Sequence, residues 1–186
     1  MSDSSHSMFV RDIMSVNVVT MPPDATIFEV AESMTKMDIG SIIITETEQD
    51  RPLGIITESD IVRRVIAEKG DPQNIVAREV MTSPIIHVEP GTALTEAMRV
   101  MAKSNIRRVA VLKNNSLAGI ITSRDLLRWS PELIDILAES LRLRSEGAKV
   151  EEEDDITYGG ECDSCGEYST DLIEEDGEYL CESCRG

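Results

Sequence analysis

Two stretches of the chain carry apolar residues at the spacing of one buried helical face, with polar residues between them. Each stretch is followed by a nearly continuous apolar run, as in a strand covered on both faces, then by a polar turn, another apolar run and a second helical pattern. A short extended segment precedes each stretch. The pattern predicts two β-α-β-β-α units, with helical faces at Ile27, Val30, Ala31 and Met34 and at Leu94, Ala97, Met98 and Met101, and strands near residues 42–44, 53–56, 109–111 and 117–121.

The two units also share sequence strings. Gly-Ile-Ile-Thr-Glu-Ser-Asp at residues 54–60 returns as Gly-Ile-Ile-Thr-Ser-Arg-Asp at residues 119–125. An earlier string, Arg-Asp-Ile-Met-Ser at residues 11–15, returns as Arg-Glu-Val-Met-Thr at residues 78–82. Because these strings recur in the same order and register, the chain contains an internal duplication.

Each Thr-x-x-Asp string allows two interpretations. Thr57 and Asp60 have the spacing of a capping box, in which the hydroxyl and the carboxylate satisfy backbone amides at the start of a helix. The same turn places a carboxylate with two acceptor oxygens beside a helix N-terminus, which suits the two hydroxyls of a ribose. The residues alone leave a purely structural role and a nucleoside-binding role open.

Residues 10–129 resemble a tandem pair of CBS domains, the module named after cystathionine β-synthase, in both strings and in the order of elements. The resemblance implies an α+β fold in which two repeats pack through their sheets into a disc with two clefts related by pseudo-twofold symmetry. We expect a flexible N-terminus at residues 1–9 and repeats at residues 10–70 and 71–130.

The resemblance further implies that the clefts bind AMP, ADP, ATP or S-adenosyl-methionine, with each cleft drawing on both repeats. Carried onto this chain, one cleft would use Thr57, Asp60, Thr82, Ile85, Ile86, Arg107 and Arg108. The other would use Thr122, Asp125, Ser15, Val18, Val19, Gly40 and Ser41. Neither copy has the His-Arg pair often found in the family before the second strand.

The two clefts differ in charge, because Arg107 and Arg108 occupy the positions that Gly40 and Ser41 occupy in the first repeat. Guanidinium groups bind phosphate in bidentate fashion. We therefore expect the Asp60 cleft to hold a phosphorylated ligand more tightly, with ordinary surface charge as the alternative role of the two arginines.

The chain of 186 residues has a net charge of −17, and residues 151–186 contain 14 acidic residues and one basic residue. This acidity makes nucleic acid an improbable partner, since phosphate binding needs Lys and Arg. No run approaches the about 18 apolar residues of a membrane span, and the start lacks the pattern of a signal peptide, so a cytoplasmic protein is expected. Pro131 opens a predicted connecting helix at residues 131–147, whose apolar stripe packs on the second repeat or on a partner chain, and an acidic linker follows at residues 148–160. The resemblance to CBS pairs, which associate through their helices, implies a homodimer.

All four cysteines lie in two C-x-x-C pairs near the end of the chain, with 15 residues separating Cys165 from Cys181. This is the spacing of a four-cysteine metal site formed by Cys162, Cys165, Cys181 and Cys184. Residues 161–186 resemble a zinc ribbon of rubredoxin-like type, a combination with CBS pairs of the kind found in archaea. Zinc is expected and iron is possible, since thiolates favour both; disulfides or free thiols are the alternative. The acidic linker predicts that the ribbon is separable from the repeats.

These features favour a regulatory binding protein over an enzyme. The sequence shows no Ser/His/Asp set and no glycine-rich phosphate loop, and its two histidines, His6 and His87, lie in unrelated segments. The predicted function is that of a sensor for an adenosine-containing ligand, which passes a change to its ribbon or to an unknown protein partner. The alternatives are a DNA-binding regulator that uses the ribbon and an iron-binding electron carrier.

Overall fold

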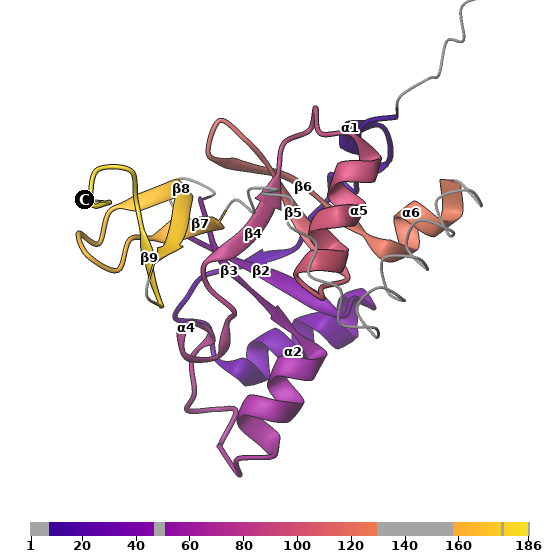
Figure 1. The fold of residues 1–186 in the computed structure, drawn as a ribbon. Coiled ribbons are helices and arrows are strands. Elements are labelled where there is room, and N and C mark those ends of the chain that lie inside the picture. Colours follow the sequence, from indigo (N-terminus) through magenta and orange to yellow (C-terminus); the bar gives the residue numbers. More distant parts are fainter. Residues whose placement is uncertain (1–7, 47–50, 130–157, 176, 186) are drawn as a thin grey trace, which may run out of the picture. The chain divides into compact units, whose positions relative to one another are not determined.

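The structure is a computed structural model that describes residues 8–46, 51–129, 158–175 and 177–185 (Figure 1). The predicted connecting helix at residues 131–147, the linker as far as residue 157 and most of the N-terminal segment lie outside these residues. No helix in the described part is long and apolar enough to cross a membrane. The chain forms two compact units, the first from residues 1–16, 87–113 and 118–156 and the second from residues 17–86, 114–117 and 157–186.

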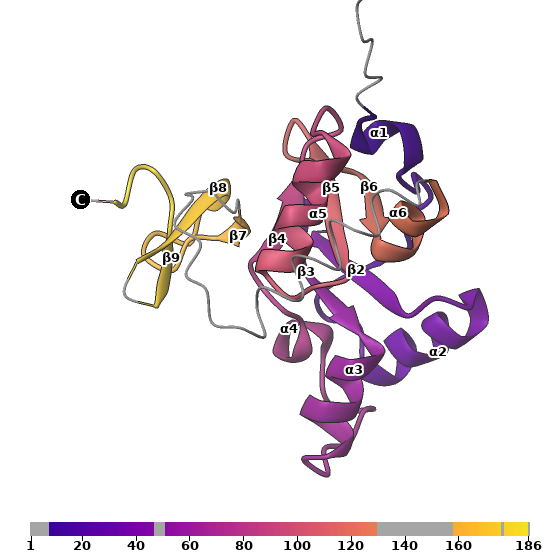
Figure 2. The same cartoon turned by 45° about the vertical axis from the view of Figure 1, so that its right-hand side comes forward.

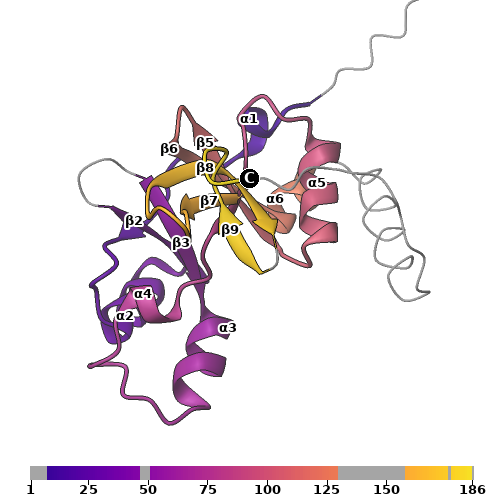
Figure 3. The same cartoon turned by 60° about the vertical axis from the view of Figure 1, so that its left-hand side comes forward.

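The second unit contains the first repeat apart from its opening segment, the segment that opens the second repeat, and the C-terminal strands. Strands β1 (Thr20–Met21) and β2 (Ser41–Glu46) are parallel, and β2 pairs antiparallel with β3 (Arg51–Thr57). Helices α2 (Ile27–Met37), α3 (Glu58–Asp60), the π-helical continuation η1 (Ile61–Ile66) and α4 (Ala77–Val80) accompany them, as Figure 3 shows. The remaining strands are β7 (Tyr158–Glu161), β8 (Tyr168–Glu175) and β9 (Glu178–Leu180).

The core of the second unit follows the predicted pattern. Ile42, Ile43 and Ile44 of β2 are fully buried, as expected for a strand covered on both faces. Val30 and Met34 of α2 belong to one core cluster with Ile42 and Ile44. Helix α2 begins with a capping box, because the Glu29 amide donates to Thr26 Oγ1 at 3.2 Å while Glu29 accepts from the Thr26 amide.

The first unit is built in the same order. It holds α1 (Val10–Ile13), α5 (Leu94–Lys103), β5 (Arg108–Lys113), most of β6 (Ser116–Thr122) and α6 (Ser123–Trp129) (Figure 2). Its strand β4 (Ile85–Val88) pairs in parallel with β5 through His87 and Val88. Met98 and Met101 of α5 are buried, which confirms that the periodic methionines are core residues.

Each unit takes its opening segment from the other repeat. In the first unit, the Val10 amide donates to Thr92 O at 2.9 Å and Ser15 forms a bridge with Ile120. In the second unit, Thr82 forms the matching bridge with Ile55. The duplicated Met-Ser and Met-Thr strings therefore pack against the strand of a repeat to which they do not belong in sequence.

Candidate functional site

Both Thr-x-x-Asp strings form the predicted capping box. The Asp60 amide donates to Thr57 Oγ1 at 3.3 Å, and the Thr57 amide and hydroxyl donate to Asp60 Oδ2 at 2.9 and 2.6 Å. Thr122 and Asp125 make the same three contacts at 3.3, 2.9 and 2.6 Å. Each cap uses Oδ2 of the carboxylate and leaves Oδ1 outside the cap, so the structural role does not exhaust the acceptor capacity of either aspartate.

The glycine that opens each string makes room for the opening segment of the other repeat. A Cβ atom on Gly54 would lie 2.7 Å from Thr82 O and 2.8 Å from Met81 Sδ. A Cβ atom on Gly119 would lie 2.9 Å from both Ser15 O and Met14 Sδ. The absence of a side chain at Gly54 and Gly119 thus lets Thr82 and Ser15, respectively, approach the strand that ends at each Thr-x-x-Asp turn.

In the second unit, this approach gathers a polar cluster at the end of β3. The Thr82 amide donates to Ile55 O at 2.9 Å, two residues before Thr57. Arg64 then bridges the two sides, with its Nε 3.6 Å from Asp60 Oδ1 and a terminal nitrogen 3.2 Å from Thr82 Oγ1. The cluster therefore combines a carboxylate, two hydroxyls and a guanidinium group beside a helix start.

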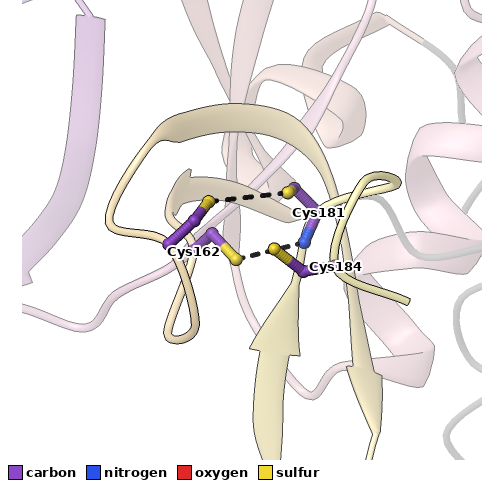
Figure 4. A group of neighbouring side chains, drawn as sticks. Cys162, Cys181 and Cys184 are labelled. Atoms are coloured by element: carbon purple, nitrogen blue, oxygen red, sulfur yellow. Dashed lines mark hydrogen bonds between the residues drawn. The ribbon is translucent and has the colours of Figure 1, made fainter. Parts of the chain in front are cut away.

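The four cysteines lie together beyond the C-terminal ends of β7 and β9, which directly precede Cys162 and Cys181. Their sulfur atoms all lie within 4.8 Å of one another, and Cys165 Sγ is 3.8 Å from Cys181 Sγ. Figure 4 shows the side chains of Cys162, Cys181 and Cys184 pointing into one common space. Four sulfur atoms at about 2.3 Å from a central zinc ion form a tetrahedron with edges of about 3.8 Å, so the cluster fits a tetrahedral metal ion.

The backbone of the two C-x-x-C turns favours thiolates. Amides of Cys165 and Cys181 donate to Cys162 Sγ and lower the pKa of this thiol to about 6. The Glu167 amide lowers the pKa of Cys165, but burial and hydrogen bonds with the other thiols outweigh it and raise that pKa to about 12. Because neighbouring thiolates repel one another, a divalent cation is what allows all four to be ionised together.

Strand β7 joins the cysteine-bearing ribbon to the rest of the second unit. It pairs antiparallel with β8 on one side and with β4 on the other, where Ile85 lies opposite Gly159 and Ile86 opposite Tyr158. Strand β7 begins at Tyr158, so the ribbon includes residues that the charge pattern assigns to the linker.

Side-chain contacts extend this attachment. The Tyr168 hydroxyl donates to Pro52 O at 3.0 Å, and the Arg51 guanidinium lies 5.5 Å from the centre of the Tyr168 ring. Arg78 and Glu161 form an ion pair at 3.3 Å. The ribbon therefore belongs to the same compact unit as most of the first repeat, and its separate unfolding, which the acidic linker predicts, stays a prediction.

A family comparison decides the identity of the duplicated part. The model of the CBS domain matches residues 10–67 and again residues 77–132, which together make up more than half of the chain. The chain is a CBS-domain protein. Its two CBS repeats coincide with the duplication found in the sequence.

Relatives of this CBS pair include an archaeal protein of similar length and solved structures with bound zinc or AMP. Uncharacterized protein MK0525 of Methanopyrus kandleri is 35% identical over 179 residues, which cover 96% of this chain and 91% of MK0525. The structure of Hypoxic Response Protein I with two coordinated zinc ions superposes with a TM-score of 0.61 at 32% identity, covering 67% of this chain and all of that protein. CBS domain protein PAE2072 from Pyrobaculum aerophilum, complexed with AMP, superposes with a TM-score of 0.62 at 28% identity, covering 71% and 99% of the two chains.

Within each unit, the CBS fold brings together part of each predicted site. The second unit contains five residues of the Asp60 site, namely Thr57, Asp60, Thr82, Ile85 and Ile86. Ile85 is buried, whereas Ile86 is half-buried. Ser15, Thr122 and Asp125 share the first unit, where the Ser15 amide donates to Ile120 O at 2.9 Å.

The other predicted residues do not belong to the same unit as the aspartate of their site. Arg107 and Arg108 belong to the first unit, where Arg107 O accepts from the Ser123 amide at 3.0 Å. Val18, Val19, Gly40 and Ser41 belong to the second unit, and Gly40 O accepts from the Glu58 amide at 3.4 Å. Their joint clefts with Asp60 and Asp125 stay predictions.

Sequence reasoning missed Arg64. It lies four residues after Asp60, and the spacing i, i+4 on a helix was the available signal, because it places an acid and a base on one face. The matching position in the second repeat is Trp129, so the duplication gave no reason to single out position 64.

Proposed function

We propose that this protein is a non-catalytic regulatory protein whose CBS pair binds an adenosine-containing ligand at Asp60 and Asp125. The observation that carries the proposal is that each capping box uses Oδ2 of its aspartate, so that Oδ1 stays outside the cap, where that of Asp60 forms a 3.6 Å ion pair with Arg64 Nε. A ribose supplies two neighbouring hydroxyl donors, which such an oxygen accepts. The AMP complex of the related protein PAE2072 supports the choice of an adenine nucleotide.

The ligand class is tested by calorimetry with AMP, ADP, ATP and S-adenosyl-methionine on protein from which copurified small molecules have been removed. Asp60→Asn exchanges an acceptor oxygen for a donor amide and should weaken binding by about 1.5–3 kcal/mol at its site. Glu58→Gln is the matched control, since it removes an exposed carboxylate from the same turn. Absence of heat with every ligand would refute the proposal.

The four cysteines are proposed to hold one zinc ion that stabilises the ribbon. Support comes from the 3.8 Å distance between Cys165 Sγ and Cys181 Sγ, which matches an edge of a tetrahedral zinc–sulfur site. Iron fits the same ligands, and elemental analysis together with a visible absorption spectrum distinguishes the two metals. An iron-loaded ribbon would favour the alternative of an electron carrier.

Homodimer formation through the helices of the CBS pair is also proposed. Phe28 of α2 is 49% exposed, and Val62 and Ile66 of η1 are 58% and 56% exposed. These apolar side chains lie on helices of one unit and would lose contact with water in a dimer. Light scattering that gives a monomer mass at high micromolar concentration would contradict this state.

A further inference from the structure

Arg64 connects Asp60, which the proposed function assigns to the nucleotide, with Thr82, which the resemblance to CBS domains assigns to the same cleft. Its Nε lies 3.6 Å from Asp60 Oδ1, and one terminal nitrogen lies 3.2 Å from Thr82 Oγ1. The other terminal nitrogen donates to Val80 O at 2.8 Å and to Met81 O at 3.2 Å. The Arg64 guanidinium group therefore contacts both the capping box and the segment that leads into β4.

Most of the partners of the Arg64 guanidinium group are neutral. The two carbonyls and the hydroxyl are neutral acceptors, whereas a phosphate would add a second charge and a bidentate geometry to the bonds of the guanidinium group. The contact with Asp60 is an ion pair longer than an ordinary hydrogen bond, and the Arg64 side chain is 46% exposed. The ion pair with Asp60 is therefore the contact that Arg64 can give up at low cost.

Asp60 has the complementary property. Its Oδ2 accepts from the Thr57 amide and hydroxyl, so Oδ1 is the oxygen that a ribose hydroxyl would use. A ribose at Oδ1 competes with Arg64 for the same atom. The displaced guanidinium then needs a new anionic partner, and a phosphate on the same ligand provides one in bidentate geometry.

We infer that Arg64 determines the specificity of the Asp60 site by selecting ligands that carry both a ribose diol and a phosphate. The inference rests on the proposed function and deepens it. The second repeat has Trp129 at the matching position and therefore no cation there. The Asp60 site should accordingly prefer a nucleotide to its nucleoside more strongly than the Asp125 site does.

The test compares AMP with adenosine by calorimetry in an Asp125→Asn background, so that the Asp60 site dominates the heat. In that background, AMP should bind at least about tenfold more tightly than adenosine. Arg64→Gln should remove most of this ratio by weakening AMP while leaving adenosine unchanged or slightly tighter. Arg63→Gln, an exposed neighbour with the same loss of charge, should keep the ratio.

Arg64→Lys provides a second variant that keeps the charge, and it should retain part of the ratio. Equal losses of AMP and adenosine affinity in Arg64→Gln would overturn the inference, because they would indicate a merely structural role. An unchanged ratio would overturn it as well, while leaving the proposed function intact. Failure of the parent protein to bind either ligand would overturn both.

Discussion

Gly160 is the position where the attachment of the ribbon can be tested with a single methyl group. A Cβ atom there would lie 2.8 Å from Pro84 Cβ and 3.2 Å from Pro84 Cα. Neither side can retreat freely, because Gly159 pairs with Ile85 across β7 and β4 and Gly160 pairs with Ser169 in β8. Gly160→Ala therefore forces a shift of backbone in an already paired edge.

The size of the effect follows from two opposing terms. Overpacking costs typically about 1–3 kcal/mol, while replacing glycine by alanine gains about 0.4–1 kcal/mol through the unfolded chain. The net expectation is a loss of between about zero and 2.6 kcal/mol in the free energy of unfolding, and a control that carries the same gain should differ from it by the overpacking cost of about 1–3 kcal/mol. Gly91→Ala is the matched control, since its Cβ would meet only an Arg11 side-chain nitrogen at 3.9 Å, and it should be neutral or slightly stabilising.

Urea unfolding measures this difference. All three tyrosines, Tyr158, Tyr168 and Tyr179, lie in the ribbon, so tyrosine absorbance follows the ribbon specifically. We expect the Gly160→Ala transition to occur at lower urea than the Gly91→Ala transition in metal-loaded protein. Coincident transitions of the two variants would refute the docking of β7 on β4.

Two further predictions concern the same segment. Cys181→Ser should abolish stoichiometric zinc in elemental analysis. It should also lower the stability of the ribbon, because a structural metal supplies much of the folding energy of so small a module. Zinc retained by this variant would contradict the proposed site. Burial raises the pKa of Tyr168 to about 12, with Arg51 opposing the shift and Glu46 adding to it. Because this folded-state pKa lies above the ordinary value of 10.0, the associated stability is complete below pH 10 and is lost as the pH rises from about 10 to 12. Burial also raises the pKa of Tyr158 and of Tyr179, so an absorbance titration should show three tyrosines ionising above pH 10, and Tyr168→Phe should remove the last step.

Local patterns predict much of this fold because they act within a few residues. The capping boxes of Thr57 with Asp60 and of Thr122 with Asp125 follow from spacing alone, and the burial of Met34 and Met101 follows from helical periodicity. The four-cysteine cluster was also predictable, since a C-x-x-C turn places two sulfur atoms on one side of the chain.

Long-range partners were not predictable in the same way. The bridge between Ser15 and Ile120 joins segments of different repeats, and the pairing of Ile85 with Gly159 joins a CBS strand to the ribbon. Both join segments that are far apart in the sequence, and no local spacing encodes which segments pair. The role of Arg64 escaped notice because its partners Val80 and Thr82 lie far along the chain.

The central claim, that the paired aspartates bind an adenosine-containing ligand, is tested most directly by titrating AMP into the parent protein and into the Asp60→Asn/Asp125→Asn double variant. The account predicts saturable heat with the parent protein and little or none with the double variant, although the capping positions still carry side chains of the same shape. Equal AMP affinity in the two proteins, with circular dichroism showing both folded, would contradict the claim.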